Sequence, residues 1–408
     1  MEYVGNKYTI AVLAALALAA GSAQAQAPAR VVAPDATAEK GAKDADKARI
    51  EISGKVQADY IFDFKRVDPE WNSTLRPSKI PINCPGDPGC GKDGETIFSV
   101  KQTQIAVKGF IPTTAGEIKS EISLDLFNGG TTNSFRLLNA WAQLGNWAVG
   151  QYYTLFMNID TFPNTIDYWG PNGMTFIRNP QLRYTMPYGK DMKLAVSLES
   201  PGSAIDTGKV GAAAPGVGIQ GRTHYPDVIG RWSLERESST LQVAAVLRSI
   251  GWETTTTPDN NPSGTKAGYG ATVMGFLGVG KGKDRVTGQL VFGKGIASYM
   301  NDGGVDIAPN LASREAETVK SVGGFVYFDH YWSDKWSSSF GGSLHRQTNT
   351  DGQLDNAFHE GRYASANLLY YPAKNILVGG ELLYGRNEQK DGMTGKDQRV
   401  QFSAQLKF

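Results

Sequence analysis

Residues 399–408, at the C-terminal end of the chain, read RVQFSAQLKF and alternate strictly between two kinds of side chain. Apolar residues occupy one set of positions and polar residues the other: Val400, Phe402, Ala404, Leu406 and Phe408 against Arg399, Gln401, Ser403, Gln405 and Lys407. A period of two predicts a β-strand with one apolar and one hydrated face. The charged second face fits the water-filled lumen of a barrel and does not fit the packed core of a sandwich.

The same alternation recurs through most of the chain, and its clearest other example lies between residues 117 and 126. There the apolar and polar sets are Ile118, Ile122, Leu124 and Leu126 against Lys119, Glu121, Ser123 and Asp125. A soluble sheet with one solvated face would alternate in the same way. An export signal, the length of the strands and the terminal aromatic residue favour a membrane barrel over that alternative.

We predict sixteen strands of this kind, joined by alternating short and long connectors. Their approximate ranges are 49–65, 95–110, 116–127, 134–144, 147–154, 181–187, 191–200, 226–234, 239–250, 267–280, 284–296, 320–332, 335–347, 359–371, 374–386 and 397–408. Short turns at one rim and long loops at the other are typical of outer-membrane barrels, and sixteen strands leave an aqueous channel. The predicted fold class is therefore all-β, a 16-stranded antiparallel transmembrane β-barrel.

The N-terminal segments read as export and lead-in sequences. In residues 1–25, Lys7 precedes the apolar run Thr9–Ala20, and Ala23-Gln24-Ala25 is a small-x-small cleavage site, which together predict a secretory signal peptide. Residues 26–48 carry almost no large apolar side chain and predict a flexible periplasmic segment. Residues 49–408 form the predicted barrel. The formal net charge of +1 gives no reason to expect a nucleic-acid partner.

The two cysteines of the chain, Cys84 and Cys90, flank a Pro-Gly-rich turn. An exported protein meets an oxidising compartment, so the pair predicts a small disulfide loop. A metal site is the alternative for this pair, although no histidine lies nearby. Asp259–Asn261 and Asn301–Gly303 are more typical of solvated loops than of calcium sites. We predict no metal and no cofactor.

The long connector Phe156–Pro180 is aromatic and rich in proline and glycine, and it has neither helical nor alternating periodicity. Long structureless loops inside compact proteins are commonly functional, and disordered loops lack such aromatic content. We predict that this connector folds into the barrel and sets the width of a pore.

Five arginines are candidates for lining that pore. Four follow the lumen-facing parity of their strands and the fifth closes the loop: Arg136, Arg183, Arg231, Arg248 and Arg178. Guanidinium groups stay charged and bind carboxylates in a bidentate way, so an arginine-lined constriction favours anions. Asp160 and Asp167 of the loop are placed to oppose them. The alternative is that the arginines pair with Glu121, Asp125 and Asp227 across the lumen.

Aromatic residues near the predicted strand ends suggest interfacial girdles. They are Tyr60, Phe62, Trp141, Trp147, Tyr152, Tyr153, Trp332, Trp336, Tyr370, Tyr371 and Tyr384. Catalysis is not supported, because the one close Ser and His pair, Ser343 and His345, faces the lumen, where a lipid substrate does not reach. We predict that the protein is not an enzyme.

Several segments resemble the DcaP-like outer-membrane porins. They are YIFDFKRVDP from Tyr60, LRPSKIPINCPGDPGCGKDGETIFSVKQTQ from Leu75, FPNTIDYWGPNGM from Phe162 and FIRNPQLRYT from Phe176. The likeness covers most of residues 50–408 and is strongest in the first half. The sequence departs from the family in lacking a coiled coil in residues 26–48. It also has Leu138 where relatives often carry a second basic residue, two positions after Arg136.

The resemblance implies a homotrimeric porin of the Gram-negative outer membrane, embedded in lipid and lipopolysaccharide. It further implies a basic constriction, a preference for small anions, notably dicarboxylates, and a role for Phe408 in recognition by the barrel-assembly machinery. Our first hypothesis is a passive channel for small anionic solutes. The alternatives are a general porin with little charge selectivity and a structural or adhesive barrel with a plugged lumen.

Overall fold

The computed structural model describes residues 47–128, 130, 132–280 and 282–408. The predicted signal peptide (residues 1–25) and residues 26–46 of the predicted periplasmic segment lie outside this part of the chain. No described segment forms a helix that is long and apolar enough to cross a membrane.

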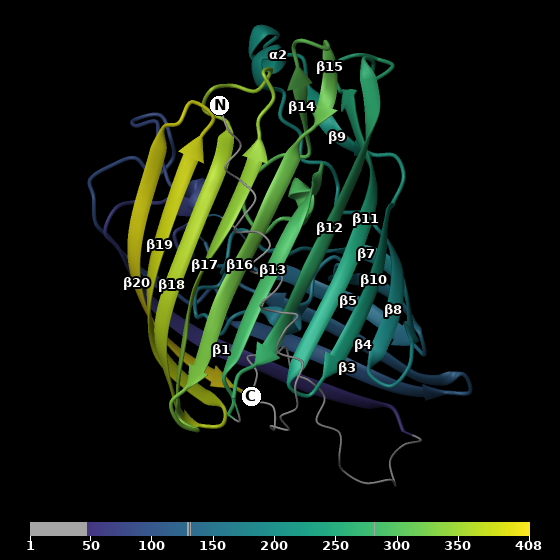
Figure 1. Cartoon of the computed structure of the whole chain (residues 1–408), viewed down its shortest axis with the longest axis vertical. Coiled ribbons are helices and arrows are strands. Elements are labelled where there is room, and N and C mark those ends of the chain that lie inside the picture. Colours follow the sequence, from purple (N-terminus) through teal and green to yellow (C-terminus); the bar gives the residue numbers. More distant parts are fainter. Residues whose placement is uncertain (1–46, 129, 131, 281) are drawn as a thin grey trace.

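The described residues form twenty strands, one short α-helix and four 3-10 turns (Figure 1). The strands are β1 (Arg49–Asp63), β2 (Glu95–Ser99), β3 (Gln104–Thr113), β4 (Gly116–Asp125), β5 (Arg136–Leu144), β6 (Trp147–Tyr153), β7 (Arg178–Pro187), β8 (Met192–Glu199), β9 (Ile219–Thr223), β10 (Asp227–Arg236), β11 (Ser239–Thr254), β12 (Ser263–Gly278), β13 (Arg285–Lys294), β14 (Ile307–Asn310), β15 (Glu315–Thr318), β16 (Lys320–Tyr331), β17 (Trp336–Thr348), β18 (Phe358–Ala373), β19 (Ile376–Gln389) and β20 (Thr394–Lys407). The helix is α2 (Gly208–Ala213), and the turns are η1 (Pro69–Trp71), η2 (Pro77–Lys79), η3 (Ile159–Thr161) and η4 (Ala297–Tyr299).

Eighteen of the strands form one sheet, and that sheet closes on itself because β1 pairs with β20 in antiparallel register from Lys55↔Lys407 to Asp63↔Arg399. β2 and β3 pair with successive parts of β1 and share one position in the wall. β9 and β10 share another position beside β11. The wall therefore has sixteen strand positions, and the predicted 16-stranded antiparallel barrel is confirmed.

Several predicted boundaries are wrong, each for a local reason. The strand predicted at 95–110 is interrupted between β2 and β3, where the Gln102 side chain turns inward and donates to the Asp59 carboxylate over 3.1 Å. Some segments predicted as loops contain β9, the β14–β15 hairpin and α2. They lie among the long connectors outside the membrane wall, where a strand needs no apolar face and so leaves no alternating pattern in the sequence. β7 begins at Arg178, inside the predicted long loop.

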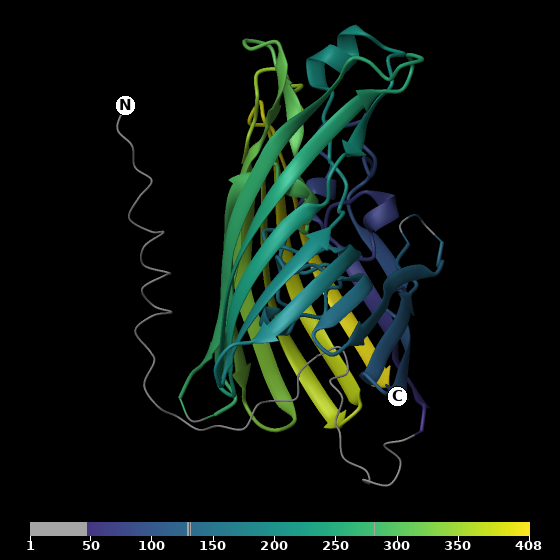
Figure 2. The same cartoon turned by 90° about the vertical axis from the view of Figure 1, so that its right-hand side faces the viewer.

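The wall is much taller on one side than on the other. β11, β12 and β18 each have 16 residues, whereas β6 has 7 and β8 has 8. At about 3.3 Å per residue the longest strands are roughly twice the length of the shortest. Figures 1 and 2 show the tall wall of β11–β20 and the low wall of β3–β8. The long connectors, with α2, β9, β14 and β15, stand above the tall wall, and the C-terminus lies at the opposite rim (Figure 1).

The two faces of the strands have the chemistry that the alternation predicts. On β20 the outward Phe402 and Leu406 are 55% and 53% exposed, whereas the inward Gln401 and Ser403 are buried. Exposed apolar side chains also cover the outside of the low wall, among them Phe98 and Val149. This outer surface is suited to lipid, and the inner surface is polar.

The predicted aromatic girdles are only partly correct. Tyr60, Trp147, Trp332 and Trp336 are exposed on the outside of the barrel. Trp141, Tyr152, Tyr153 and Tyr371 face inward instead, as the bond from Asn164 Nδ2 to the Tyr371 hydroxyl illustrates. One cause is a β-bulge at Leu138 of β5, opposite Ser123 and Leu124 of β4, which exchanges the faces of β5 on either side of it.

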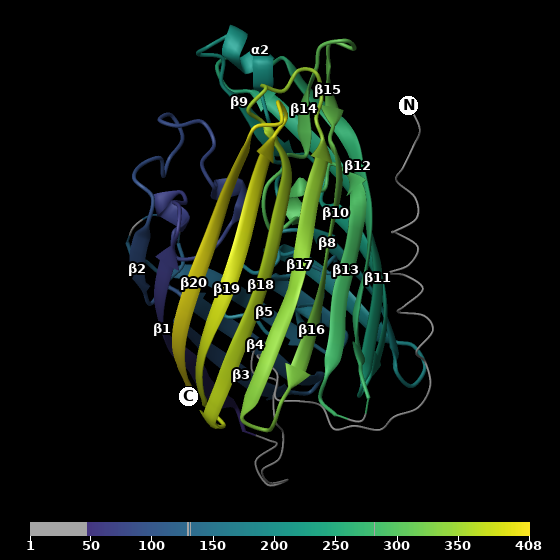
Figure 3. The ribbon, with the colours of Figure 1, turned by 60° about the vertical axis from the view of Figure 1, so that its left-hand side comes forward.

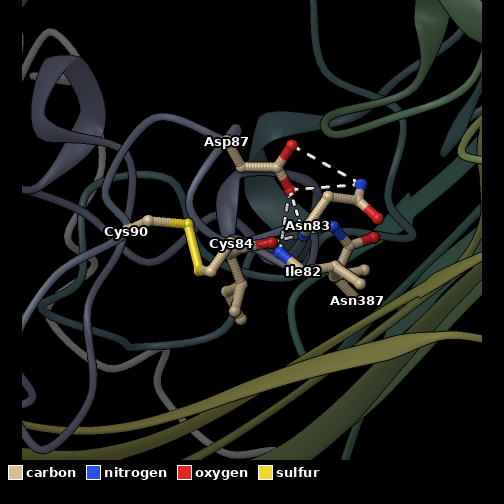
Figure 4. The surroundings of a disulfide bond; sticks show 7 residues. Ile82, Asn83, Cys84, Asp87, Cys90 and Asn387 are labelled. Atoms are coloured by element: carbon tan, nitrogen blue, oxygen red, sulfur yellow. Dashed lines mark hydrogen bonds between the residues drawn. A yellow bond between two sulfur atoms is a disulfide. The ribbon is translucent and has the colours of Figure 1, made fainter.

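The predicted disulfide between Cys84 and Cys90 is present, with the two Cα atoms 5.5 Å apart. Figure 4 shows how the loop is braced: the carboxylate of Asp87 accepts from the backbone N–H groups of Ile82 and Asn83, each over 2.8 Å. Asn387 of β19 donates to the Ile80 carbonyl and holds the start of the loop against the wall. The disulfide therefore closes a compact turn within the long β1–β2 connector.

Candidate functional site

The connector between β6 and β7 lies inside the barrel. Its backbone is held by inward-facing side chains of several strands of the tall wall. Gln242 donates to Met157 O, Arg285 to Phe162 O, Asn367 to Asn164 O and Gln401 to Ile166 O, and Gly173 N donates to Ser343. One segment reaches the polar faces of β11, β13, β17, β18 and β20 only from within the closed sheet. These hydrogen bonds agree with the predicted inward path of the connector.

Asp167 is the central anchor of this loop. Its carboxylate accepts from the Thr74 hydroxyl at 2.8 Å, from Leu75 N and Gly170 N at 3.1 Å, and from the Tyr363 hydroxyl at 3.1 Å. The side chain is buried, and this burial raises the pKa of the Asp167 carboxyl above its usual range. Asp167 therefore fastens two connectors to the wall, and it does not offer a charge to the water of the lumen.

Arg248 has a comparable role in a second inward connector, residues 295–306. Its guanidinium contacts Asp227 at 2.8 Å and Asp306 at 2.9 Å, and its side chain is 1% exposed. It also donates to the carbonyl oxygens of Gly202 and Gly295. Arg248 therefore follows the predicted alternative, in which an arginine pairs with a wall carboxylate such as Asp227. It holds the connector in place and does not line an open passage.

A third connector, residues 64–82, joins the other two. Arg76 contacts Asp302 at 2.9 Å, and its guanidinium lies over the rings of Trp71 and Trp169 at 4.2 and 4.5 Å. Ser78 also donates to Asp302 through its N–H and its hydroxyl. Since Trp169 belongs to the β6–β7 connector and Asp302 to residues 295–306, the three segments are linked into one unit inside the barrel.

Arg136 of β5 is paired but remains partly open to water. It contacts Asp125 at 2.6 Å and the Tyr168 hydroxyl at 2.7 Å, and its side chain is 25% exposed. Tyr168 also donates to Asp125, and burial raises the pKa of the Tyr168 hydroxyl. Arg136 therefore pairs with Asp125, as the predicted alternative expected, and it also contacts the β6–β7 connector through Tyr168.

Arg183 and Arg231 face inward and form no ion pair with a carboxylate of the described residues. Arg183 of β7 donates to Gln181 Oε1 at 3.0 Å and to the Tyr153 carbonyl. Arg231 of β10 makes no hydrogen bond or ion pair with the described residues, and its Nε is buried without a partner. The two like charges are close enough to interact electrostatically. Glu235, Glu199 and, on the β6–β7 connector, Asp160 are each near enough to Arg231 for a Coulombic interaction.

Arg178 lies at the point where the connector rejoins the wall. It donates to the Tyr153 hydroxyl at 2.7 Å, and its guanidinium is 4.3 Å from the centre of the same ring. The Phe176 ring lies on the same guanidinium at 5.0 Å. No carboxylate of the described residues pairs with Arg178, and its Nε is buried without a partner.

The lumen-facing lysines of the low wall are functional candidates that our sequence analysis missed. The inward parity of their strands would have identified them: Lys55 of β1, Lys108 of β3, Lys119 of β4 and Lys193 of β8. Lys108 and Lys193 have carboxylate partners in Glu121 and Glu235. Three of these lysines, on β3, β4 and β8, lie on the low wall. The low wall faces the connector from the side opposite its main contacts, which are with β13 and β16–β20.

The contacts of Ser343 and His345 agree with their predicted position facing the lumen. Ser343 Oγ accepts from Gly173 N at 2.7 Å, and His345 Nδ1 lies 2.7 Å from the Asp302 carbonyl. Both side chains hold connectors against the inside of the wall. Within the described part of the chain, no group of three or more His, Cys, Asp and Glu side chains is arranged to hold a metal ion.

Several solved structures have a similar fold. The outer membrane channel DcaP of Acinetobacter baumannii has a TM-score of 0.75 at 20% identity, covering 88% of this chain and 97% of that one. An anion-selective porin from Comamonas acidovorans has a TM-score of 0.56 at 8% identity, covering 89% and 100%. The trimer form of OmpT from Vibrio cholerae has a TM-score of 0.53 at 9% identity, covering 89% and 100%.

A search of curated proteins gave no match. The model of one protein family, described as the DcaP outer membrane protein, matches residues 35–408 and confirms the resemblance in the sequence. The chain belongs to the DcaP outer membrane protein family.

Proposed function

We propose that this porin of the Gram-negative outer membrane is a passive diffusion channel that prefers small anions, among them dicarboxylates. The observation that carries the proposal is the pair Arg183 and Arg231, which face inward from β7 and β10 and form no ion pair with the described residues, although Glu199 lies near both. An unpaired guanidinium in a narrow, low-dielectric passage attracts anions and binds carboxylates in a bidentate way. The similarity to an anion-selective porin is consistent with this preference.

The β6–β7 connector supplies the other side of the proposed constriction. It rests mainly on β13 and β16–β20, so its other side faces β7 and β10, where Arg183 and Arg231 lie. Asp160 on the connector gives this gap a transverse field. A dicarboxylate fits such a gap because its two charges can meet Arg183 and Arg231 in turn as the solute passes.

The test is the reversal potential of the purified protein in a planar bilayer under a KCl gradient, with and without succinate. We expect an anion-selective reversal potential and a reduction of the chloride current by succinate. Selectivity near zero, or for cations, would support the general porin in which wall pairing cancels the charge. Negligible conductance would support the plugged barrel, an alternative that the three linked connectors make worth testing.

The same proposal includes a homotrimer and an N-terminal export signal. The low wall, with its exposed apolar side chains, is the natural surface for contact between protomers. Cross-linking of the protein in native membranes, followed by unheated electrophoresis, tests the trimer. Sequencing of the mature N-terminus tests whether cleavage follows Ala25 and leaves residues 26–48 in the periplasm.

A further inference from the structure

Four cations lie side by side on the outside of the tall wall. They are Arg346 of β17, Arg362 of β18, Arg386 of β19 and Lys396 of β20, which we call the outer basic cluster. The strand register places Arg362 opposite Arg386, and Arg386 opposite Lys396. Arg346 lies one pair nearer the rim, opposite Glu360. Figure 3 shows these four strands running next to each other in the outer wall.

The cluster faces outward, on the same side as the apolar belt. Arg362 lies opposite Leu344, which is exposed, and it shares its face with Leu368, which is 50% exposed. The side chains of Arg346 and Arg362 are 56% and 53% exposed. These charges therefore do not belong to the lumen or to the proposed constriction.

The height of the cluster matches the outer edge of the membrane. Tyr370, which stacks on Trp336 with 4.5 Å between ring centres, marks the lower girdle on the same strand as Arg362. The step of eight residues from Arg362 to Tyr370 spans about 26 Å along the strand, or roughly 20 Å of height at a tilt of about 40°. This is close to the height of a barrel's apolar band, which is about 25 Å. The cluster lies on the side of the long connectors, which face the cell exterior in outer-membrane barrels.

One buried carboxylate organises the cluster. Glu360, whose side chain is 7% exposed, contacts Arg362 at 2.6 Å and Arg346 and Arg386 at 4.0 Å each. Arg386 is also paired with Glu388 at 2.8 Å. Two carboxylates thus face four cations, so the cluster keeps an excess of positive charge. Guanidinium groups held in fixed positions are well suited to bind the oxygens of a phosphate.

An apolar groove lies between the cluster and the lower girdle, on β1, β2 and β17–β20. Its volume is about 520 Å³; its lining includes Leu368, Gly380 and Phe402 and extends down to Trp336 and Tyr370. Gly380 stands opposite both Leu368 and Phe402 in the sheet, and a Cβ at this position would lie 3.1 Å from the Phe402 ring. The missing side chain at Gly380 therefore opens a hollow between larger neighbours, six residues along β19 from Arg386.

We propose that the outer basic cluster binds the phosphorylated headgroup of a glycolipid of the outer leaflet, with an acyl chain in the groove at Gly380. A charge facing the edge of the hydrocarbon needs an anionic partner, and outer-leaflet glycolipids carry phosphates at that height. A soluble phosphate would not use the groove, which favours a lipid as the ligand. This site lies outside the lumen, so the proposal does not depend on the anion preference proposed for the channel.

The test is native mass spectrometry of the full mature chain in a nonionic detergent, titrated with bisphosphorylated lipid A. The variant Arg346→Gln/Arg362→Gln/Arg386→Gln should bind roughly 10- to 100-fold more weakly, since each cation near a membrane surface contributes to anionic lipid binding. The matched control is Lys190→Gln/Arg236→Gln/Lys283→Gln, which removes three exposed cations at the opposite rim and should bind like the wild type. Gly380→Leu should weaken the binding of lipid A without changing its salt dependence.

Three further arms make the outcome decisive. Dephosphorylated lipid A should bind the wild type no better than it binds the triple variant, and inorganic phosphate at millimolar concentration should not displace lipid A. An Arg→Lys triple variant keeps the charge and should retain most of the binding, which covers the case that the Gln variant does not fold. Equal binding by wild type and charge-removed variant, or full competition by inorganic phosphate, would overturn the proposal.

Discussion

At the scale of single residues, the partner of an arginine decides its role. Arg248 and Arg231 both face inward from neighbouring strands, and the sequence pattern places them alike. Arg248 lies between Asp227 and Asp306 and is closed to water, whereas Arg231 has no such partner among the described residues. The first fastens a connector and the second is available to a solute.

Replacing the two unpaired arginines should reduce anion selectivity. For Arg183→Gln/Arg231→Gln we expect the chloride-to-potassium permeability ratio to fall by a factor on the order of 10, since the focused positive potential is removed. Reversal potentials in planar bilayers under a salt gradient measure this ratio. Arg236→Gln, at the exposed turn rim, is the matched control and should leave the ratio unchanged. An unchanged ratio in the double variant would exclude these residues from the constriction.

Replacing Arg248 should affect stability more than selectivity. Arg248→Met leaves the buried Asp227 and Asp306 without their counter-charge, which costs about 3–5 kcal/mol for a buried pair. We expect the denaturant midpoint of the folded, heat-modifiable form to decrease accordingly. Arg346→Met, on the exposed outer wall, is the comparison and should unfold like the wild type. Equal midpoints for both variants would contradict the anchoring role.

At the scale of elements, the inward connectors depend on close contacts with the wall. The β6–β7 connector approaches β16 and β17 so closely at Gly173 that an added Cβ would lie 1.9 Å from the Leu344 carbonyl oxygen. In the same way, a Cβ added to Gly323 on β16 would lie 2.6 Å from the Gly173 carbonyl oxygen. The two glycines thus form the contact that sets how far the connector projects into the lumen.

A single methyl group at this contact should narrow the pore. In Gly173→Ala the connector has to move away from β17 and toward the low wall, at a cost of roughly 1–3 kcal/mol for overpacking. We expect a smaller single-channel conductance than in the wild type. Gly230→Ala adds the same methyl group on the outside of β10, where nothing lies within 4 Å, and should leave the conductance as it is. Unchanged conductance in Gly173→Ala would show that the connector does not limit the pore.

At the scale of the whole molecule, charge is distributed unevenly over a chain whose formal net charge is only +1. Arg183 and Arg231, inward cations without a carboxylate contact, lie on β7 and β10, and outward cations gather at the upper edge of the tall wall. The proposed channel and the proposed lipid site therefore use opposite faces and different sides of the same barrel. Each can be altered without changing the other.

The anion preference should weaken as salt concentration rises. The Debye length is about 10 Å at 0.1 M and about 3 Å at 1 M, so salt screens the field of Arg183 and Arg231 across the lumen. We expect the permeability ratio, from reversal potentials at fixed gradient, to approach that of free diffusion in 1 M KCl. A ratio independent of salt would mean that direct contacts at the narrowest section, rather than the long-range field, select the ion.

The sequence by itself determined the barrel, because an alternation with period two and a charged second face can be read from RVQFSAQLKF and from its counterparts along the chain. It also determined the disulfide and the inward-facing strand positions away from bulges. Only the tertiary structure decided which aromatic residues face lipid, because one bulge at Leu138 exchanges the faces of β5 within that strand. It also decided which arginines are paired, because Arg248 meets Asp306, 58 residues away, through a connector whose path no local pattern specifies.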